Sequence, residues 1–159
     1  MTYEHINFFK DLSPEQHRLI ESLFLYQEDG AGTVLFEQGE VTDCLFIVLG
    51  GEVEIVYKPE DGPALVVTRV PSNNIVGWSA ALGNPNYTSS AVCSTNCAFL
   101  YVSSEDLRNL CAQHPDLCPI ILDRLAVMIA KRLRNTHQHV IDLLREGLQI
   151  QRDSLVQDK

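Results

Sequence analysis

Hydrophobic and polar residues change their spacing twice along the chain, near residue 30 and near residue 103, and so divide it into three regions. The first region contains a serine and a proline, Ser13 and Pro14, in the order that starts many helices. The apolar residues that follow recur at helical spacing: Leu19, Ile20, Leu23 and Phe24. The first region is therefore predicted to be helical.

The second region alternates short apolar runs with turns rich in glycine, proline and asparagine, a pattern that predicts strands. We expect these strands at residues 33–36, 45–49, 52–57, 64–70, 75–76, 88–92 and 98–102. In one of them Ile55 and Tyr57 alternate with Glu52 and Glu54, which indicates one face in solvent. The pattern favours a mainly β fold with flanking helices, namely a double-stranded β-helix jelly roll with N-terminal helices and a long C-terminal helix.

The third region returns to helical spacing. A capped start at Ser103 predicts a short helix, and a longer helix follows from residue 119 to about residue 150. Roughly thirty residues at about 1.5 Å each make the second helix longer than a domain of this size needs. One heptad seam runs along it, interrupted at Thr136 and Gly147: Ala126, Ile129, Leu133, Val140, Leu143 and Ile150.

Two interpretations of this long helix stay open. Either it packs only on its own domain, or part of it also pairs with a second copy of the chain. We favour the second interpretation, which predicts a homodimer formed through residues 119–150. The chain then divides into residues 1–118, an N-terminal helix and jelly-roll domain, and residues 119–159, a long C-terminal dimerisation helix and tail.

Charge is unevenly distributed along the sequence. The 159 residues include 12 Lys and Arg against 21 Asp and Glu, a net charge of −9. Residues 1–118 carry −11, and residues 119–159 carry +2. The basic residues of the long helix are interpreted as a solvated face: Lys131, Arg132, Arg134 and Arg145. Because the chain as a whole has no basic excess, we expect no nucleic-acid binding by this chain alone.

Features of membrane insertion and export are missing from the sequence. No apolar run approaches the roughly 20 residues that a membrane-spanning helix needs. Residues 1–10 do not show the basic and apolar segments of a signal peptide. We therefore expect a cytoplasmic chain without a membrane partner.

Residues typical of metal sites and of catalysis are missing where a jelly-roll enzyme would need them. None of the five histidines lies between residues 18 and 113, which argues against a metal-binding cupin. No Gly-x-Ser-x-Gly motif is present. The cysteines are interpreted as free thiols: Cys44, Cys93, Cys97, Cys111 and Cys118. We predict no metal, no cofactor, no catalytic residue and no enzymatic activity.

The segment from residue 75 to residue 92 is the best candidate for a binding site. Gly77 opens a run of small residues suited to one helical turn, a Gly-Asn-Pro-Asn turn follows at residues 83–86, and a strand begins with Tyr87 and Thr88. Free backbone amides in such small-residue runs form concave nests that bind anions.

The order of elements resembles the cyclic-nucleotide-binding domain of the catabolite-activator (CRP/FNR-like) family of bacterial regulators, over almost the whole chain. Residues 32–40 are similar to the family's first strand and glycine turn, and residues 43–53 to its next hairpin. Residues 77–92 lie where its phosphate-binding cassette belongs, and residues 131–136 resemble part of its dimerisation helix. The resemblance implies the jelly-roll fold, a regulatory ligand, and a threonine, here Thr136, that reaches a nucleotide base.

The cassette departs from the family's pattern at both residues that recognise the nucleotide. Nucleotide-binding members open it with Gly-Glu, whose glutamate holds the ribose 2′-hydroxyl, and have an arginine for the phosphate about ten residues later. This chain has Trp78 after Gly77, has Tyr87 or Thr88 in the arginine's place, and contains no Arg or Lys between residues 70 and 107. A phosphate without that cation loses a charge-assisted bond worth roughly 1.5–3 kcal/mol. The resemblance therefore implies a degenerate cassette that does not bind cyclic AMP or cyclic GMP in the usual way.

The predicted ligand-binding residues come from the cassette and the long helix: Gly77, Trp78, Ser79, Ala80, Tyr87, Thr88, Ser89 and Thr136. Two interpretations of the pocket stay open. Either it is remodelled for a less charged or aromatic ligand, or Trp78 fills it as part of the core.

The predicted function is that of a regulatory domain that senses an unknown small molecule and signals through its C-terminal helix. One alternative is a ligand-independent interaction or scaffold domain. Another is the sensor part of a transcription regulator whose DNA-binding domain is absent from this chain. A haem-sensing variant, with His5 and Cys44 as nominated ligands, is a weaker third alternative.

Overall fold

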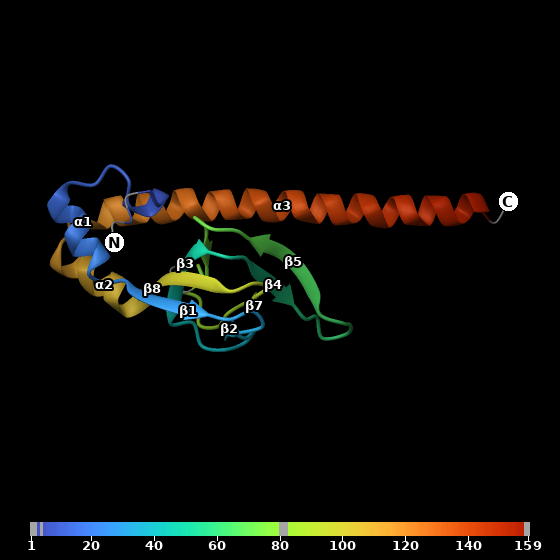
Figure 1. The fold of residues 1–159 in the computed structure, drawn as a ribbon, viewed down its shortest axis with the longest axis horizontal. Coiled ribbons are helices and arrows are strands. Elements are labelled where there is room, and N and C mark those ends of the chain that lie inside the picture. The colour runs from blue at the N-terminus through green and yellow to red at the C-terminus, as the bar shows by residue number, and fades with distance from the viewer. Residues whose placement is uncertain (1–2, 4, 80–82, 158–159) are drawn as a thin grey trace.

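The computed structural model (Figure 1) describes residues 3, 5–79 and 83–157, with backbone only from residue 150 onward. In this part of the chain the strands form two four-stranded antiparallel sheets, in the orders β1-β8-β3-β6 and β2-β7-β4-β5. The strand bounds are β1 Leu25–Asp29, β2 Val34–Phe36, β3 Cys44–Gly50, β4 Val53–Tyr57, β5 Leu65–Val70, β6 Ile75–Val76, β7 Ser90–Cys93 and β8 Cys97–Ser103. The helices are a 3₁₀ turn at Asn7–Phe9, α1 Pro14–Glu21, α2 Ser104–Gln113 and α3 Cys118–Gln157. The predicted jelly roll with N-terminal helices and a long C-terminal helix is confirmed.

The strand β1 is not predicted by the sequence, which indicates strands only from residue 33. Its first two residues, Leu25 and Tyr26, are both exposed, and the next three are polar, so the usual alternation of apolar and polar positions is missing. The strand pairs along its whole length with β8, from Leu25 opposite Tyr101 to Asp29 opposite Cys97. The side chains of this strand do not show a pattern of buried apolar positions. We therefore attribute the strand to backbone pairing at the edge of the sheet.

Both helix starts that the sequence predicts at serines are confirmed. The Ser13 hydroxyl accepts a hydrogen bond from the backbone N–H of Gln16, and the Gln16 side chain accepts one from the backbone N–H of Ser13. At the start of α2, the Ser103 hydroxyl accepts from the backbone N–H of Asp106. These caps satisfy backbone donors that the first turn of a helix leaves free.

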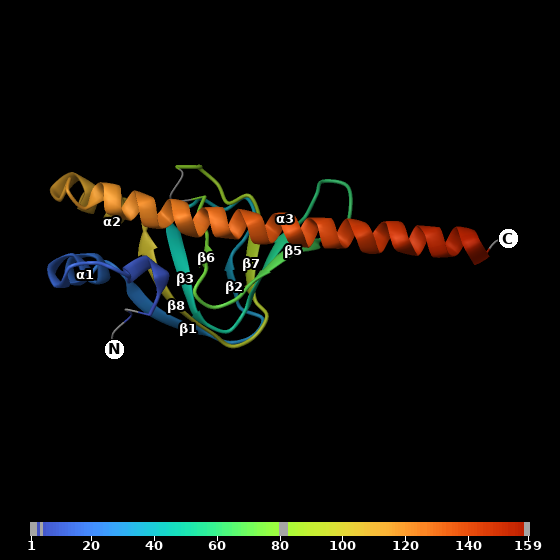
Figure 2. The ribbon, with the colours of Figure 1, turned by 90° about the horizontal axis from the view of Figure 1, so that it is seen from above.

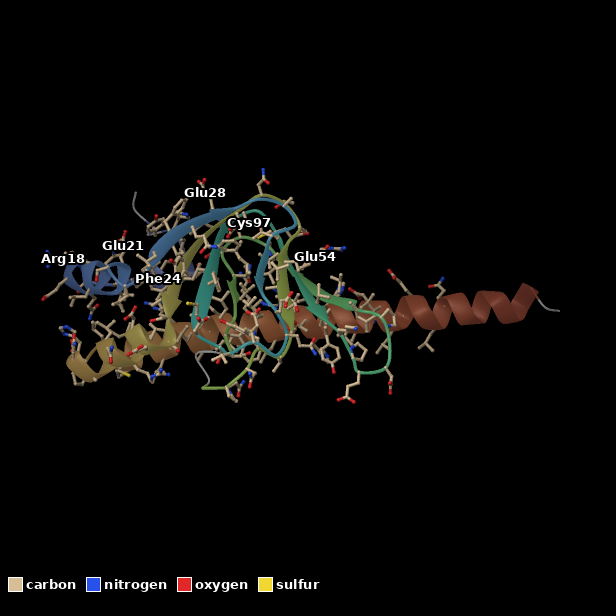
Figure 3. The ribbon with its side chains drawn as sticks, turned by 90° about the horizontal axis from the view of Figure 1, so that it is seen from below. Arg18, Glu21, Phe24, Glu28, Glu54 and Cys97 are labelled. Atoms are coloured by element: carbon tan, nitrogen blue, oxygen red, sulfur yellow. The ribbon has the colours of Figure 1, made fainter. Side chains whose placement is uncertain are left out.

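Buried apolar side chains form two clusters. The first lies where α1, α2 and the first half of α3 meet the β1-β8-β3-β6 sheet, and includes Phe8, Phe9, Ile20, Leu45, Leu100, Ile121 and Leu125. Phe24, labelled in Figure 3 at the junction of α1 and β1, belongs to it as well. The second lies between the two sheets and includes Phe36, Phe46, Val53, Val70 and Phe99. We call these the helical cluster and the sheet cluster.

The helix α3 has 40 residues, which makes it roughly 60 Å long, and its two halves have different surroundings. The first half lies against the sandwich, and the second half extends past it (Figures 1 and 2). The buried face of the first half is spaced at three and four residues: Ile121, Leu125, Met128 and Arg132. The helix continues beyond the predicted end near residue 150, to Gln157.

The predicted heptad seam lies beside this buried face and is largely uncovered. Ala126, Leu133, Val140 and Leu143 are exposed, Ile129 is half-buried, and Ile150 falls where only the backbone is described. Long as α3 is, no helix in the described part of the chain is apolar enough to cross a membrane. Pairing of the seam with a second copy remains a prediction, and so does the division into residues 1–118 and 119–159.

Candidate functional site

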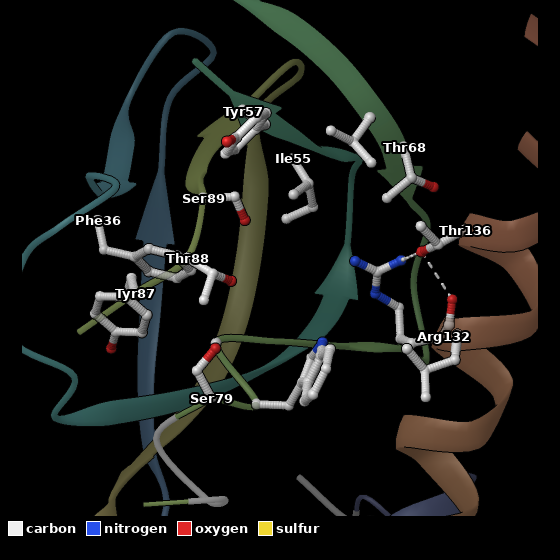
Figure 4. A pocket seen from close by; sticks show the side chains of 14 residues that line it. Phe36, Ile55, Tyr57, Thr68, Ser79, Tyr87, Thr88, Ser89, Arg132 and Thr136 are labelled. Atoms are coloured by element: carbon white, nitrogen blue, oxygen red, sulfur yellow. Dashed lines mark hydrogen bonds between the residues drawn. The ribbon is translucent and has the colours of Figure 1, made fainter. Parts of the chain in front are cut away.

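An open pocket of about 420 Å³ lies between the cassette segment, the strands β2, β4 and β5, and α3 (Figure 4). Most of the predicted ligand-binding residues line it: Gly77, Trp78, Ser79, Tyr87, Thr88, Ser89 and Thr136. Ala80, the remaining predicted residue, lies outside the described residues. The fold therefore brings residues of the cassette and of α3 to one cavity, and their binding of a ligand stays a prediction.

Other lining residues were not predicted from the sequence: Phe36, Ile55, Tyr57, Val67, Thr68, Arg132 and Leu133. Two of them could have been predicted from the sequence, because Ile55 and Tyr57 lie on the same side of β4 in the apolar–polar alternation of that strand. Arg132 could also have been predicted, since it stands four residues before Thr136 and lies on the same face of the helix. No sequence pattern indicates the lining side chains of β2 and β5, because their position at the cavity depends on how the two sheets pack around it.

Gly77 fixes the path of the chain as it leaves β6. Its φ of +78° lies in the left-handed region that favours glycine. A Cβ atom at this position would lie 2.8 Å from the carbonyl oxygen of Cys44, closer than van der Waals contact allows. A larger residue would therefore push the cassette away from β3 and change the wall of the pocket.

Tyr87 closes the other end of the cassette. Its ring stacks on Phe36, with the ring centroids 3.8 Å apart and the planes inclined by 14°. Its hydroxyl donates to the carbonyl oxygen of Cys44 at 2.9 Å and accepts from the backbone N–H of Cys44 at 3.2 Å. Burial raises the pKa of Tyr87, so the hydroxyl remains a donor at neutral pH. Since both ring and hydroxyl are engaged, we interpret Tyr87 as a support of the pocket wall.

Trp78 lies where the pocket meets the helical cluster. The side chain is half-buried, packs against that cluster and also lines the pocket. About 420 Å³ stays open beside it. The indole therefore does not fill this pocket, and remodelling of the cavity for another ligand stays a prediction.

Arg132 places a positive charge in the pocket. The expectation of a solvated basic face is wrong for this residue, which is only 5% exposed, whereas Arg134 and Arg145 are exposed. Figure 4 shows its side chain reaching from α3 into the space enclosed by the strands. The cation that residues 70–107 do not provide is therefore supplied by the C-terminal helix.

Neutral groups hold the Arg132 guanidinium. Its Nε donates to the carbonyl oxygen of Ile75 at 3.2 Å, and its Nη1 donates to Thr136 Oγ1 at 3.1 Å. Thr136 Oγ1 in turn donates to the carbonyl oxygen of Arg132 at 2.9 Å. Among the residues that the structure describes, no carboxylate forms an ion pair with Arg132, and its Nη2 makes no hydrogen bond. Burial lowers the pKa of Arg132 to about 10, which leaves it charged at neutral pH.

Several side chains that carry a hydroxyl group also line the cavity. They belong to Thr68, Ser79, Thr88 and Ser89. None of these side chains makes a hydrogen bond to another residue in the described ranges. In Figure 4 the side chains of Ser79, Thr88 and Ser89 lie across the cavity from Arg132. Because a hydroxyl can both donate and accept, these groups can bind the polar part of a ligand.

The two residues nominated as haem ligands, His5 and Cys44, do not line this pocket. Residues 5–79 and 83–157 contain no cluster of three side chains that could hold a metal ion. The haem alternative is not supported at the pocket, because His5 is exposed and neither His5 nor Cys44 lines it. Burial, together with Asp43, raises the pKa of the Cys44 thiol to about 11, which disfavours the thiolate that binds metals. All five cysteines are free.

Sequence comparisons relate the chain to proteins that bind cyclic nucleotides. The family model described as cyclic nucleotide-binding domain matches residues 28–114. The CRP-like cAMP-activated global transcriptional regulator of Mycobacterium tuberculosis is 28% identical over 113 residues, which cover 71% of this chain and 49% of that protein. The cAMP-activated global transcriptional regulator CRP of Pasteurella multocida is 26% identical over 112 residues, which cover 70% and 52%. The chain thus spans about half the length of the curated relatives it matches.

Solved structures with the same fold are also found. A cyclic nucleotide-binding domain from Methylobacillus flagellatus superimposes with a TM-score of 0.76 at 24% identity, covering 84% of this chain and 75% of that chain. The catabolite activator protein of Thermus thermophilus superimposes with a TM-score of 0.68 at 25% identity, covering 87% and 63%. Because the family model covers more than half of the residues, the chain belongs to the cyclic nucleotide-binding domain family, and it is similar to CRP-like regulators.

Proposed function

We propose that this chain is a regulatory domain that senses a small anionic molecule in its pocket and passes the signal to α3. One observation carries the proposal: Arg132 is a buried charge without a carboxylate partner among the described residues, and it lines an open cavity. Membership of the family, and relatives named as cAMP-activated regulators, support a regulatory ligand.

The energetics of Arg132 favour an anion as that ligand. Removing a charge from water costs several kcal/mol, and neutral acceptors such as the Ile75 carbonyl offset only part of this cost. An anion in the pocket accepts hydrogen bonds from the free Nη2, and charge-assisted bonds of this kind are about twice as strong as neutral ones. A ligand that binds only the folded state then raises its stability by mass action.

Cyclic AMP and cyclic GMP are not expected to bind in the way usual for the family. Where the family resemblance implies the glutamate and the arginine that recognise a nucleotide, this chain has Trp78 and either Tyr87 or Thr88. Arg132 supplies a cation from another element, but no carboxylate among the described lining residues can accept from a ribose hydroxyl. We therefore expect cyclic nucleotides to bind more weakly than micromolar.

The signal would pass to α3 because the pocket and the exposed seam share residues. Leu133 lines the pocket and is 51% exposed, and Thr136 lines the pocket while interrupting the seam. A ligand held by Arg132 therefore contacts the same turns of helix that we expect to pair with a second copy of the chain. A shift or rotation of α3 on ligand binding would change the dimer interface directly.

The whole protein is proposed to act in transcription regulation. This proposal extends to it the role printed in the names of its relatives, with the present domain as the sensor. Since the chain carries a net charge of −9, we do not expect these residues themselves to bind nucleic acid.

Thermal unfolding in the presence of small anions tests the sensing proposal. The variants are Arg132→Met, and Arg134→Met as a control at an exposed arginine of the same helix. Cyclic AMP, cyclic GMP, inorganic phosphate and a set of carboxylates are each added at millimolar concentration. A ligand at a hundred times its Kd stabilises by about 2.7 kcal/mol, which raises the midpoint by roughly 5–10 °C in a chain of this size.

The proposal predicts that at least one anion raises the midpoint of the unaltered chain and of Arg134→Met but not of Arg132→Met. Equal responses in all three proteins would contradict it, because Arg132 would then not be the anchor. If no anion changes any midpoint, the ligand-independent interaction domain becomes the better account. The exposed apolar side chains of α3 favour that second candidate: Leu133, Val140, Leu143, Leu144 and Leu148.

A further inference from the structure

We infer that the ligand of this pocket is a small aromatic monoanion of the carboxylate type rather than a cyclic nucleotide. The inference rests on the proposed function, since it names the chemical class of the anion that Arg132 holds. It is carried by the charges, the apolar walls and the hydrogen-bonding groups of the described lining residues.

The charge of the lining limits the charge of the ligand. Among the described lining residues, Arg132 is the one charged side chain, and its guanidinium keeps its charge at neutral pH. A neutral ligand would leave this buried cation without a counter-ion. A dianion would bring a second charge into a cavity without a second cation. A single negative charge matches the site.

The walls of the pocket are mainly apolar and include several aromatic rings. Phe36 and Tyr57 come from β2 and β4, Trp78 from the cassette, and Ile55 and Leu133 add aliphatic surface. Aromatic side chains bind flat rings through stacked or edge-to-face contacts. The volume of about 420 Å³ lies within the lower range of small-molecule pockets and suits a body of one or two rings.

The polar groups are placed so that one end of such a ligand can satisfy them. Figure 4 shows Arg132 on one side of the cavity and Thr88 and Ser89 on the other, with Ile55 between Ser89 and Arg132 and with Tyr57 next to Ser89. A carboxylate in this space can accept hydrogen bonds from the guanidinium or from a hydroxyl. The ring attached to it then lies against apolar side chains. The free Nη2 of Arg132 gives this carboxylate a donor that no described residue uses.

A cyclic nucleotide is also a monoanion, but its remaining surface fits this lining poorly. Its sugar hydroxyl and the polar edge of its base need acceptors and donors far from the phosphate. The described lining offers no carboxylate for the hydroxyl, and much of the wall is formed by side chains such as Ile55, Val67 and Leu133. A buried polar group without a partner weakens binding by roughly tenfold or more.

Calorimetric titration with matched pairs of compounds tests the inference. The probes are benzoate, cinnamate, 2-naphthoate and indole-3-acetate, each paired with its neutral primary amide, alongside cyclic AMP and cyclic GMP. The proteins are the full chain, Arg132→Met, and Arg134→Met as the control outside the pocket. Far-UV circular dichroism and the unfolding midpoint establish that each variant is folded.

We expect at least one carboxylate to bind the full chain and Arg134→Met about 10- to 100-fold more tightly than its amide, and more tightly than either nucleotide. In Arg132→Met the carboxylate should bind no better than the amide. The inference is overturned if every carboxylate binds as weakly as its amide, or if a nucleotide binds more tightly than all of them. A nucleotide response that disappears in Arg132→Met would overturn this inference alone and leave the proposed function standing. An anion response unaffected by Arg132→Met would overturn the proposed function as well.

Discussion

Arg132 and Arg134 stand two residues apart on one helix, yet their side chains end in opposite environments. Arg134 is exposed, whereas Arg132 is buried against Ile75 and Thr136. The difference follows from helical geometry, because two residues are separated by about 200° around the axis. A basic residue whose helix face continues a buried apolar stripe is therefore a candidate site residue, even in a segment that looks like a solvated charged surface.

The hydroxyl of Tyr87 is expected to contribute to stability more than to ligand binding. Tyr87→Phe removes the two hydrogen bonds to the backbone of Cys44 and keeps the ring stacked on Phe36. We expect a loss of about 1–2 kcal/mol in the free energy of unfolding, measured by urea denaturation. Tyr57→Phe is the control, since Tyr57 lines the pocket and its hydroxyl bonds no described residue. An equal loss in both variants, or none in Tyr87→Phe, would contradict the assigned role.

Gly77 provides a second test at this scale, and Gly83 provides its control. Both have a positive φ, +78° and +74°, but a Cβ at Gly83 has no atom of another residue within 4 Å. Gly83→Ala should therefore cost only the backbone strain, about 1 kcal/mol, while Gly77→Ala adds the contact with the Cys44 carbonyl and should cost roughly 1–3 kcal/mol more. Urea denaturation of both variants measures the difference. Equal costs would show that the cassette is not held against β3.

At the scale of elements, α3 has a buried face and an exposed seam next to it. One face buries Ile121, Leu125 and Met128 in the helical cluster, and the neighbouring seam stays uncovered. Thr136 lies between the two faces and lines the pocket. Pocket residues therefore lie next to the seam on one helix, so the signal that we propose needs no intermediate element.

The dimer proposal predicts a different oligomeric state for a seam variant and a control variant. Leu143, on the seam, and Val127, outside it, are 46% and 57% exposed. Leu143→Glu should convert a dimer into a monomer, because the two copies would bring like charges together in the seam. Val127→Glu should leave the dimer intact. Light scattering after size-exclusion chromatography measures both masses, and a full-chain protein that is monomeric at high micromolar concentration would refute the dimer.

Local patterns predict most elements of this fold and fail at two identifiable places. The capped helices and the alternation of strands and turns depend on residues that are close together in the chain, so the sequence predicts them. The strand β1 escapes prediction because its pairing partner β8 lies about 70 residues away and its own side chains do not alternate. Arg132 escapes because its burial depends on which face of α3 meets the sheets. The cassette residues that line the pocket can be predicted from the sequence because they are close together in the chain, whereas the lining side chains of β2 and β5 depend on how the two sheets pack.

At the scale of the whole molecule, the net negative charge and the buried Arg132 have opposite effects on anions. The net charge of −9 repels anions in general. Arg132 lies among apolar and hydroxyl-bearing side chains, and among the described lining residues it is the one whose charge attracts an anion. Without a ligand, this charge is expected to reduce the stability of the folded domain, because it is buried without a counter-ion.

Urea denaturation of the ligand-free protein tests this central claim most directly. The free energy of unfolding is measured for the full chain, Arg132→Met and Arg134→Met, with extensive dialysis to remove bound anions. Our account predicts that Arg132→Met is at least as stable as the full chain, with a gain of up to about 1–4 kcal/mol, while Arg134→Met stays within about 0.5 kcal/mol. If the free energy of unfolding falls by roughly 2 kcal/mol or more in Arg132→Met alone, the account is contradicted. Arg132 would then stabilise the fold by itself, and its charge would not depend on a ligand.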